Sequence, residues 1–173
     1  MAFKRDNSTT PPSDDKRKWA DYAYRIISKF TRIPGCNADI QSEEVFLNWV
    51  NQAKDIADRM EYSKAFELCL GKLLSYAPTG DDGIFPHEII RNFFENNNSE
   101  IIIGEFLTEK YNQREAHILT EGAEEEKIAQ KYFEDANKIR IEYPHTAAIL
   151  DELGGKYLGE SRYEQKMAQM DFR

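Results

Sequence analysis

Two adjacent carboxylates in a glycine-flanked loop are the residues whose types and spacing best suit chemistry. Asp81 and Asp82 lie between Gly80 and Gly83, in the most pronounced loop of the sequence. Hard oxygen ligands of this kind suit calcium or magnesium, although the loop does not have the spacing of an EF-hand. A polar turn in front of a helix accounts for the same residues. We favour the turn and keep a divalent-metal site as the alternative.

The histidines give little support to a transition-metal site. The stretch from His87 to Arg91 lacks the second histidine of a zinc-protease helix. Glu142 and His145 have the Glu-x-x-His spacing of di-iron bundles, but Pro144 lies between them and places them on different elements, so we expect His145 to begin a helix. Dinucleotide-binding, phosphate-binding and hydrolase motifs are missing from the sequence. We therefore predict no catalytic residue, no metal ligand and no cofactor.

A second polar group surrounds the segment from Asn112 to Gly122, where the helical period of the sequence fails. Polar residues in an irregular loop held by two helices are typical of a binding site. We favour the simpler interpretation, a solvated helix face whose charges pair across turns. Five residues are our candidates for partner contact: Asp81, Asp82, Asn112, Arg114 and Glu121.

Two further sets of residues are interpreted as structural. Glu88, Arg91 and Glu95 have i, i+3, i+7 spacing, which predicts ion pairs on a helix surface. Cys69 lies in an apolar run and is expected to be buried. Cys36 follows Pro34-Gly35 in a turn and is expected to be more exposed. Two cysteines without metal-ligand spacing are typical of reduced thiols in the cytosol.

The charge of the chain limits its partners. Its 173 residues carry a formal net charge of −8, with a pI near 5.0. This argues against direct nucleic-acid binding and against an anionic membrane surface, and it suits a basic protein partner. The first 18 residues lack the apolar core of a signal peptide, and no apolar run reaches the length of a membrane span. We expect a cytoplasmic protein.

The hydrophobic periodicity predicts an all-α fold, a compact bundle of six or seven helices with no significant sheet. Residues 1–12 are expected to be a flexible tail, and residues 13–173 a single helical domain. The first helix opens at Ser13 and ends before Pro34. Later helices open near Ser42, Tyr62, Pro86, Ser99, Ala123 and His145. In the last helix, glycines at 154, 155 and 159 weaken the middle and predict a break near Gly159.

The apolar residues of the first two predicted helices recur at helical spacing. In the first helix they are Trp19, Ala23, Ile26, Ile27 and Phe30. In the second, the stripe expected to face the core is Leu47, Val50, Ala53, Ile56, Ala57 and Met60, widened by Phe46 and Trp49.

Two resemblances add to this interpretation. The last 28 residues, with Thr146–Leu150, Leu153, Tyr157 and Arg162–Glu164, resemble a single tetratricopeptide-type helical hairpin, in which Gly159 would be the turn. Arrays of such hairpins form peptide-binding grooves. The stretch from Pro78 to Ala147 is similar to bacterial helical proteins of unassigned activity, which implies a bacterial origin and no particular activity. The similarity lies in Asp82-Gly83, Phe85-Pro86, Arg91, Asn112-x-Arg114, Glu121-Gly122 and Tyr143-Pro144-x-Thr146-Ala147.

We therefore expect a non-enzymatic helical interaction protein, such as an adaptor, a regulatory subunit or an immunity-type protein, whose acidic surface meets a basic partner. The alternative is a small-ligand binder or a divalent-metal-dependent enzyme that uses the loop carboxylates around Asp81 and Asp82. That alternative requires an inward-facing cluster of five residues: Asp81, Asp82, His87, Glu105 and Glu109. The sequence leaves the oligomeric state and the identity of the partner open.

Overall fold

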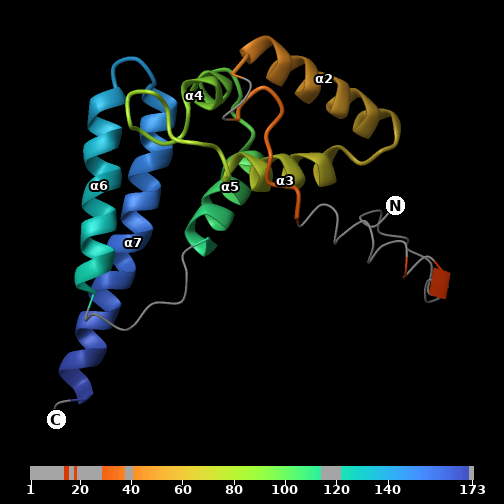
Figure 1. Cartoon of the computed structure of the whole chain (residues 1–173). Coiled ribbons are helices and arrows are strands. Elements are labelled where there is room, and N and C mark those ends of the chain that lie inside the picture. Colours follow the sequence, from red (N-terminus) through yellow and green to blue (C-terminus); the bar gives the residue numbers. More distant parts are fainter. Residues whose placement is uncertain (1–13, 16–17, 19–28, 38–40, 114–121, 172–173) are drawn as a thin grey trace.

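The computed structural model is all-α, as predicted. It describes residues 14–15, 18, 29–37, 41–113 and 122–171, and within these it has six helices and no strand (Figure 1). The helices are α2 (Glu43–Arg59), α3 (Ser63–Leu74), α4 (Glu88–Glu95), α5 (Glu100–Asn112), α6 (Ala123–Ile139) and α7 (Pro144–Asp171). Two isolated antiparallel bridges, Ile33–Cys36 and Cys36–Gln41, lie before α2. Most of the first predicted helix lies outside the described residues.

Local capping fixes where the helices begin. The Ser42 side chain accepts a hydrogen bond from the Val45 N–H at the start of α2, and Ser99 does the same for Ile102 at the start of α5. Both serines thus satisfy backbone donors that a helix start leaves free. The positions predicted from the sequence for these two helix starts are confirmed.

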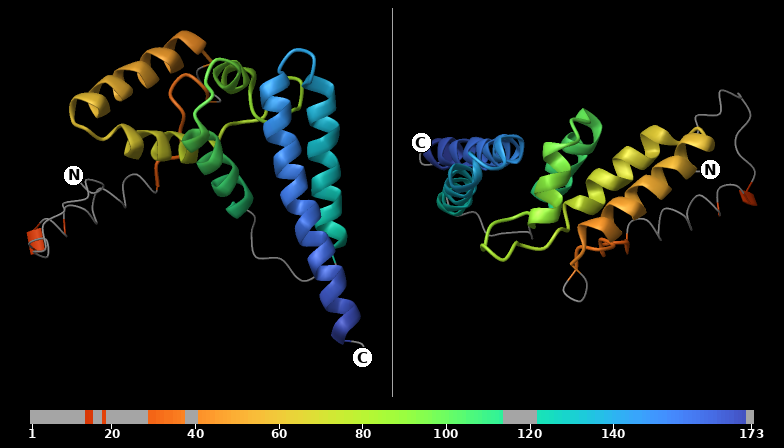
Figure 2. Two further views of the ribbon diagram at one scale, coloured as in Figure 1. Left: turned by 180° about the vertical axis from the view of Figure 1, so that it is seen from behind. Right: turned by 90° about the horizontal axis from the view of Figure 1, so that it is seen from above.

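The helices form two groups joined through α4 and α5. In Figure 1 and in both views of Figure 2, α6 and α7 lie side by side at one end of the molecule, whereas α2 and α3 lie at the other. Aromatic residues connect the elements between them: Phe46 of α2 meets Phe93 of α4 with ring centroids 5.6 Å apart, and Phe94 of α4 meets Phe106 of α5 at 5.0 Å. Such edge-to-face contacts add specific geometry to apolar burial.

The predicted break of the last helix is wrong. Helix α7 continues from Pro144 to Asp171 through all three glycines. Gly154 has a packing role there, because a Cβ at this position would lie 2.7 Å from a ring carbon of Phe133 on α6. The absence of a side chain lets the two helices approach closely, and the packing of α6 outweighs the low helix propensity of glycine.

The predicted core stripe of α2 is only partly buried. Phe46 and Val50 are buried, but Leu47, Ile56 and Met60 are exposed. Helix α2 lies at the edge of the molecule (Figure 1), so only one side of its broad apolar arc meets other described elements. Among the described residues, no helix is long and apolar enough to cross a bilayer.

Candidate functional site

The Asp81–Asp82 loop is anchored to α4 by a buried arginine. Asp82 receives two hydrogen bonds from Arg91, Nη1 to Oδ2 at 2.6 Å and Nη2 to Oδ1 at 2.9 Å, and its Oδ1 also accepts from the Ile84 N–H. This bidentate arrangement is the strongest form of a carboxylate–guanidinium contact. The hydrogen bond from Arg91 holds the pKa of Asp82 at about 2. Asp81 is exposed on the same turn.

Arg91 is 1% exposed, which corrects its prediction as a surface residue. Its Nε donates to the Pro86 carbonyl at 2.6 Å, its Nη2 also donates to the Ile84 carbonyl, and its guanidinium carbon lies 5.5 Å from the centre of the Tyr143 ring. A buried charge is tolerated when its donors are satisfied in this way. Arg91 therefore holds the loop in place through Asp82. Its Nη1 also lies 3.9 Å from Glu88, so the predicted pair of Glu88 and Arg91 is present although Arg91 itself is buried.

Glu95 is also structural, because it caps the first turn of α7. Its carboxylate accepts from the backbone N–H groups of His145 (3.1 Å) and Thr146 (2.8 Å), and from the Thr146 hydroxyl (2.9 Å). A carboxylate at this end of a helix satisfies free donors and complements the helix dipole. His145 lies in the first turn of α7, as expected. We call Asp82, Arg91, Glu95 and Thr146 the Arg91 junction.

The cluster required by the metal-dependent alternative is not assembled. Glu109 pairs with Lys72 at 3.0 Å, and Asp82 is committed to Arg91. His87 is buried and caps α4, with its Nδ1 accepting from the Ile89 N–H at 3.2 Å. Within the described ranges, no three His, Cys, Asp or Glu side chains lie close enough to hold a metal ion together.

The candidate contact residues do not form one surface. Asp81 and Asp82 lie in the loop before α4, near the turn between α6 and α7, whereas Asn112 is exposed at the far end of α5 (Figure 1). Arg114 and Glu121 lie outside the described residues. The structure thus separates the two polar groups, insofar as it describes them.

The expected order of exposure of the two cysteines is wrong, because Cys36 is more buried than Cys69. Cys36 is 1% exposed, and it packs in the core beside the bridge to Gln41, because the turn after Pro34 folds inward. Burial, followed by the charge of Glu88, raises the pKa of the Cys36 thiol to about 11. Cys69 is half-buried, not fully buried as expected, and burial raises its pKa as well. Neither environment favours the thiolate that a nucleophile needs.

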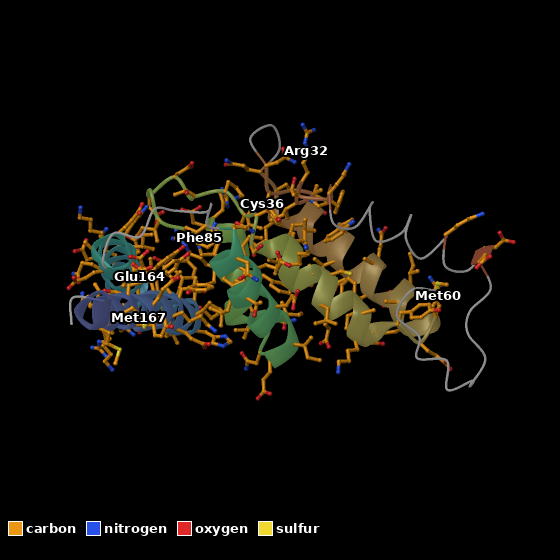
Figure 3. All side chains as sticks on the ribbon, turned by 90° about the horizontal axis from the view of Figure 1, so that it is seen from below. Arg32, Cys36, Met60, Phe85, Glu164 and Met167 are labelled. Carbon is orange, nitrogen blue, oxygen red and sulfur yellow. The ribbon has the colours of Figure 1, made fainter. Side chains whose placement is uncertain are left out.

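The end of α7 carries an apolar surface whose exposure the sequence pattern does not predict. Tyr163, Met167 and Met170 are between 42% and 71% exposed and have i, i+4, i+7 spacing, which places them on one side of the helix. Figure 3 labels Met167 near Glu164, at the C-terminal end of α7. We call these three residues the α7 tip. The difference in helix length explains this exposure. Helix α7 has 28 residues and α6 has 17, so the last turns of α7 extend past α6.

An acidic helix start lies beside the α7 tip. The Gly122 N–H donates to the Glu164 carboxylate at 3.0 Å, which places the first turn of α6 next to this part of α7. That turn contains Glu124, Glu125 and Glu126, of which Glu124 and Glu126 are exposed. This part of the structure therefore exposes apolar and acidic residues, and Arg162 and Lys166 of α7 are exposed as well.

Comparison with known proteins adds no relative: no family model, no curated protein and no solved structure matches the chain.

Proposed function

We propose that this protein is a non-enzymatic helical interaction module of the adaptor, regulatory-subunit or immunity type, and that the α7 tip is its partner-binding surface. The observation that carries the proposal is the row of exposed Tyr163, Met167 and Met170. Tyrosine and methionine are enriched in protein interfaces, where they supply large contact areas. Methionine also adapts to differently shaped partners.

Polar residues that an enzyme of this kind would need take part in ion pairs within the fold, and this supports a binding role. Asp82 and Glu109, which the enzyme alternative requires, are engaged by Arg91 and Lys72. Their contacts explain them as parts of the fold, with no need for a substrate. By contrast, within the described part of the chain, the apolar side chains at the end of α7 remain exposed.

The charge of the chain indicates the chemistry of the partner. The first turn of α6, which contains Glu124 and Glu126, begins where the Gly122 N–H meets Glu164 of α7, and the whole chain has a net charge of −8. We propose a partner that presents an apolar helix face with basic residues at its edge, because charge complementarity speeds encounter and selects partners. We also propose a cytoplasmic setting, which two unpaired cysteines suit.

The test is capture of proteins from a lysate of the source organism, followed by mass spectrometry. The Met167→Asp, Met170→Asp double variant should lose a partner that the wild-type chain captures in stoichiometric amounts, because it places charge in the apolar row. Ile141→Asp is the matched control: Ile141 is 99% exposed in the turn between α6 and α7, and its replacement should leave capture unchanged.

Equal capture by the double variant and the wild-type chain would exclude the α7 tip as the interface. Capture of no stoichiometric protein would count against the interaction module itself. Circular dichroism of both variants should match the wild-type spectrum, since the replaced side chains are exposed.

A further inference from the structure

The outer side of α2 carries an exposed row of apolar side chains. Val45, Ile56 and Met60 are between 45% and 52% exposed, and half-buried Trp49 lies in the same row. At 100° per residue the four side chains point within about 60° of one another and span about 22 Å of helix. We call them the α2 outer face. A row of this kind is typical of a helix that packs against a second helix.

The α2 outer face lies far from the α7 tip. Helix α2 is at the end of the molecule opposite α6 and α7 (Figure 1), and Figure 3 labels Met60 and Met167 at opposite ends. The core side of α2 is a different one, formed by Phe46 and Val50. A partner on the α2 outer face would therefore disturb neither the core nor the α7 tip.

We propose that the α2 outer face binds the same face of a second copy of this chain, as an antiparallel pair of α2 helices related by a two-fold axis. The spacing of the row carries this choice. Its four residues follow one another at steps of four, seven and four residues, so the row reads the same in both directions. With the axis at the middle of the row, Val45 of one copy lies opposite Met60 of the other. Trp49 lies opposite Ile56 in the same way, so every apolar side chain meets an apolar one.

Charges at the edge of the row complement this arrangement. Glu44 and Arg59 are both exposed, and they lie on the same side of the row. In the two-fold pair, Arg59 of one copy is displaced by only about 3 Å along the helix from Glu44 of the other. The symmetry forms this ion pair twice. Asp55, on the same side, comes level with Asn48 of the copy in the same way, and the Asn48 amide is a suitable donor for its carboxylate.

The distribution of charge along α2 also sets the direction of the pair. The first turn contains Glu43 and Glu44, whereas the last turn contains Arg59. A parallel pair would place the glutamates of both copies side by side, where like charges and the aligned helix dipoles repel. The antiparallel pair brings each acidic end to a basic end.

The size of the face indicates a weak dimer. Four apolar side chains and two ion pairs are fewer contacts than those of a standard interface, which has about 20–30 residues on each side. Each copy also carries a net charge of −8, which opposes association. We therefore expect a dissociation constant in the range of tens to hundreds of micromolar. The proposal goes beyond the partner binding proposed for the α7 tip and does not depend on it.

The experiment is sedimentation equilibrium of the full chain from micromolar to millimolar concentration. The mass should rise from that of one chain, 20.2 kDa, toward twice this value. Ile56→Asp should weaken the association by roughly a hundredfold, because it places a carboxylate in the apolar contact. Ile141→Asp is the matched control: it makes the same replacement at an exposed isoleucine outside the face, and it should leave the association unchanged.

Charge reversals test the direction of the pair. Glu44→Arg and Arg59→Glu should each weaken self-association by roughly tenfold, because each variant brings like charges together twice. An equimolar mixture of the two variants should associate at least as tightly as the wild-type chain, since both ion pairs of the mixed dimer again join opposite charges. Mixing cannot restore association to a variant that fails to fold, so this result separates the ion pair from a structural effect.

A single-chain mass at every concentration would overturn the proposal. Association that survives Ile56→Asp would also overturn it, and its loss in the Met167→Asp, Met170→Asp variant would then assign self-association to the α7 tip. A mixture of Glu44→Arg and Arg59→Glu that stays monomeric would overturn the antiparallel pair. Circular dichroism of each variant should match the wild-type spectrum, since every replaced side chain is exposed.

Discussion

The Arg91 junction and the outer face of α2, where Val45, Ile56 and Met60 are exposed, invert the usual distribution of charge and apolar surface. At the junction, a guanidinium is 1% exposed and each of its nitrogens donates to an acceptor. On the outer face, Ile56 and Met60 remain about half exposed although they lie on the apolar side of an amphipathic helix. The two regions teach the same lesson: the neighbours that the fold supplies decide exposure, and residue type alone does not.

Among the replacements considered, removal of the buried Arg91 guanidinium should lower the stability of the fold most. Arg91→Met keeps apolar bulk at this position but deprives Asp82 and the Ile84 and Pro86 carbonyls of their donor. A buried acceptor left without its donor costs about 1–3 kcal/mol, and two carbonyls lose theirs here, so we expect a decrease of at least this size in the free energy of unfolding, measured by urea titration with circular dichroism.

The double variant Asp82→Asn, Arg91→Met serves as the control for that loss. It no longer leaves a carboxylate without its guanidinium partner, so it should be more stable than Arg91→Met alone. A decrease below about 1 kcal/mol for Arg91→Met would show that solvent replaces the guanidinium, and the contrast between the two regions would fail.

Removal of the helix cap should have a smaller effect. Glu95→Ala deletes the acceptor for the His145 and Thr146 N–H groups at the start of α7. Because loss of a capping side chain costs about 0.5–2 kcal/mol, we expect a decrease in this range in the same titration. Glu95→Gln keeps an acceptor oxygen and should retain part of the stability. Equal stability of the alanine variant and the wild-type chain would show that water caps α7.

Titration of Asp82 should make the junction sensitive to acid. Its pKa in the folded chain is lowered from 3.8 to about 2 by the hydrogen bond from Arg91. A lowered pKa gives stability that is present above pH 3.8 and is lost as the pH falls toward 2. Because the Asp82 side chain is 41% exposed, we expect a loss of about 1 kcal/mol over this range. Urea midpoints measured from pH 5 to pH 2 should fall less steeply for Asp82→Asn; parallel curves would contradict the assignment.

Local signals in the sequence were sufficient to predict the fold class. Ser42 and Ser99 cap the predicted helices, and the periodicity of α4 and α5 places Ile90 and Phe106 in the core. These properties depend on residues within a few turns of one another. The all-α architecture is therefore confirmed. The break expected near Gly159 is wrong, since α7 continues to Asp171 and still packs on the start of α6 beyond this point, with Gly122 against Ser161.

The roles of the polar residues depended on long-range contacts that periodicity does not contain. Glu95 and Thr146 are 51 residues apart in the chain, and no local pattern joins them. The i, i+3, i+7 spacing correctly predicts that Glu88, Arg91 and Glu95 share one face of a helix. It does not tell whether that face points to solvent or to the interior. The same limitation hid the α7 tip, whose exposure follows from the difference in length between two antiparallel neighbours.

The smallest expected effect on stability is that of replacing Ile56 on the outer face of α2. It tests the comparison between this face and the Arg91 junction directly. Ile56 is 50% exposed, so Ile56→Ala removes less buried surface than a replacement in the core. A core replacement of this kind usually lowers the free energy of unfolding by about 2–5 kcal/mol. If this face packs against a neighbour, the free energy of unfolding should fall by about 1 kcal/mol. If the face stays in water, the change should match that of Ile141→Ala, within about 0.5 kcal/mol of zero. A loss above about 2 kcal/mol would place Ile56 in the core and remove the contrast with Arg91, because both residues would then be fully enclosed by the fold.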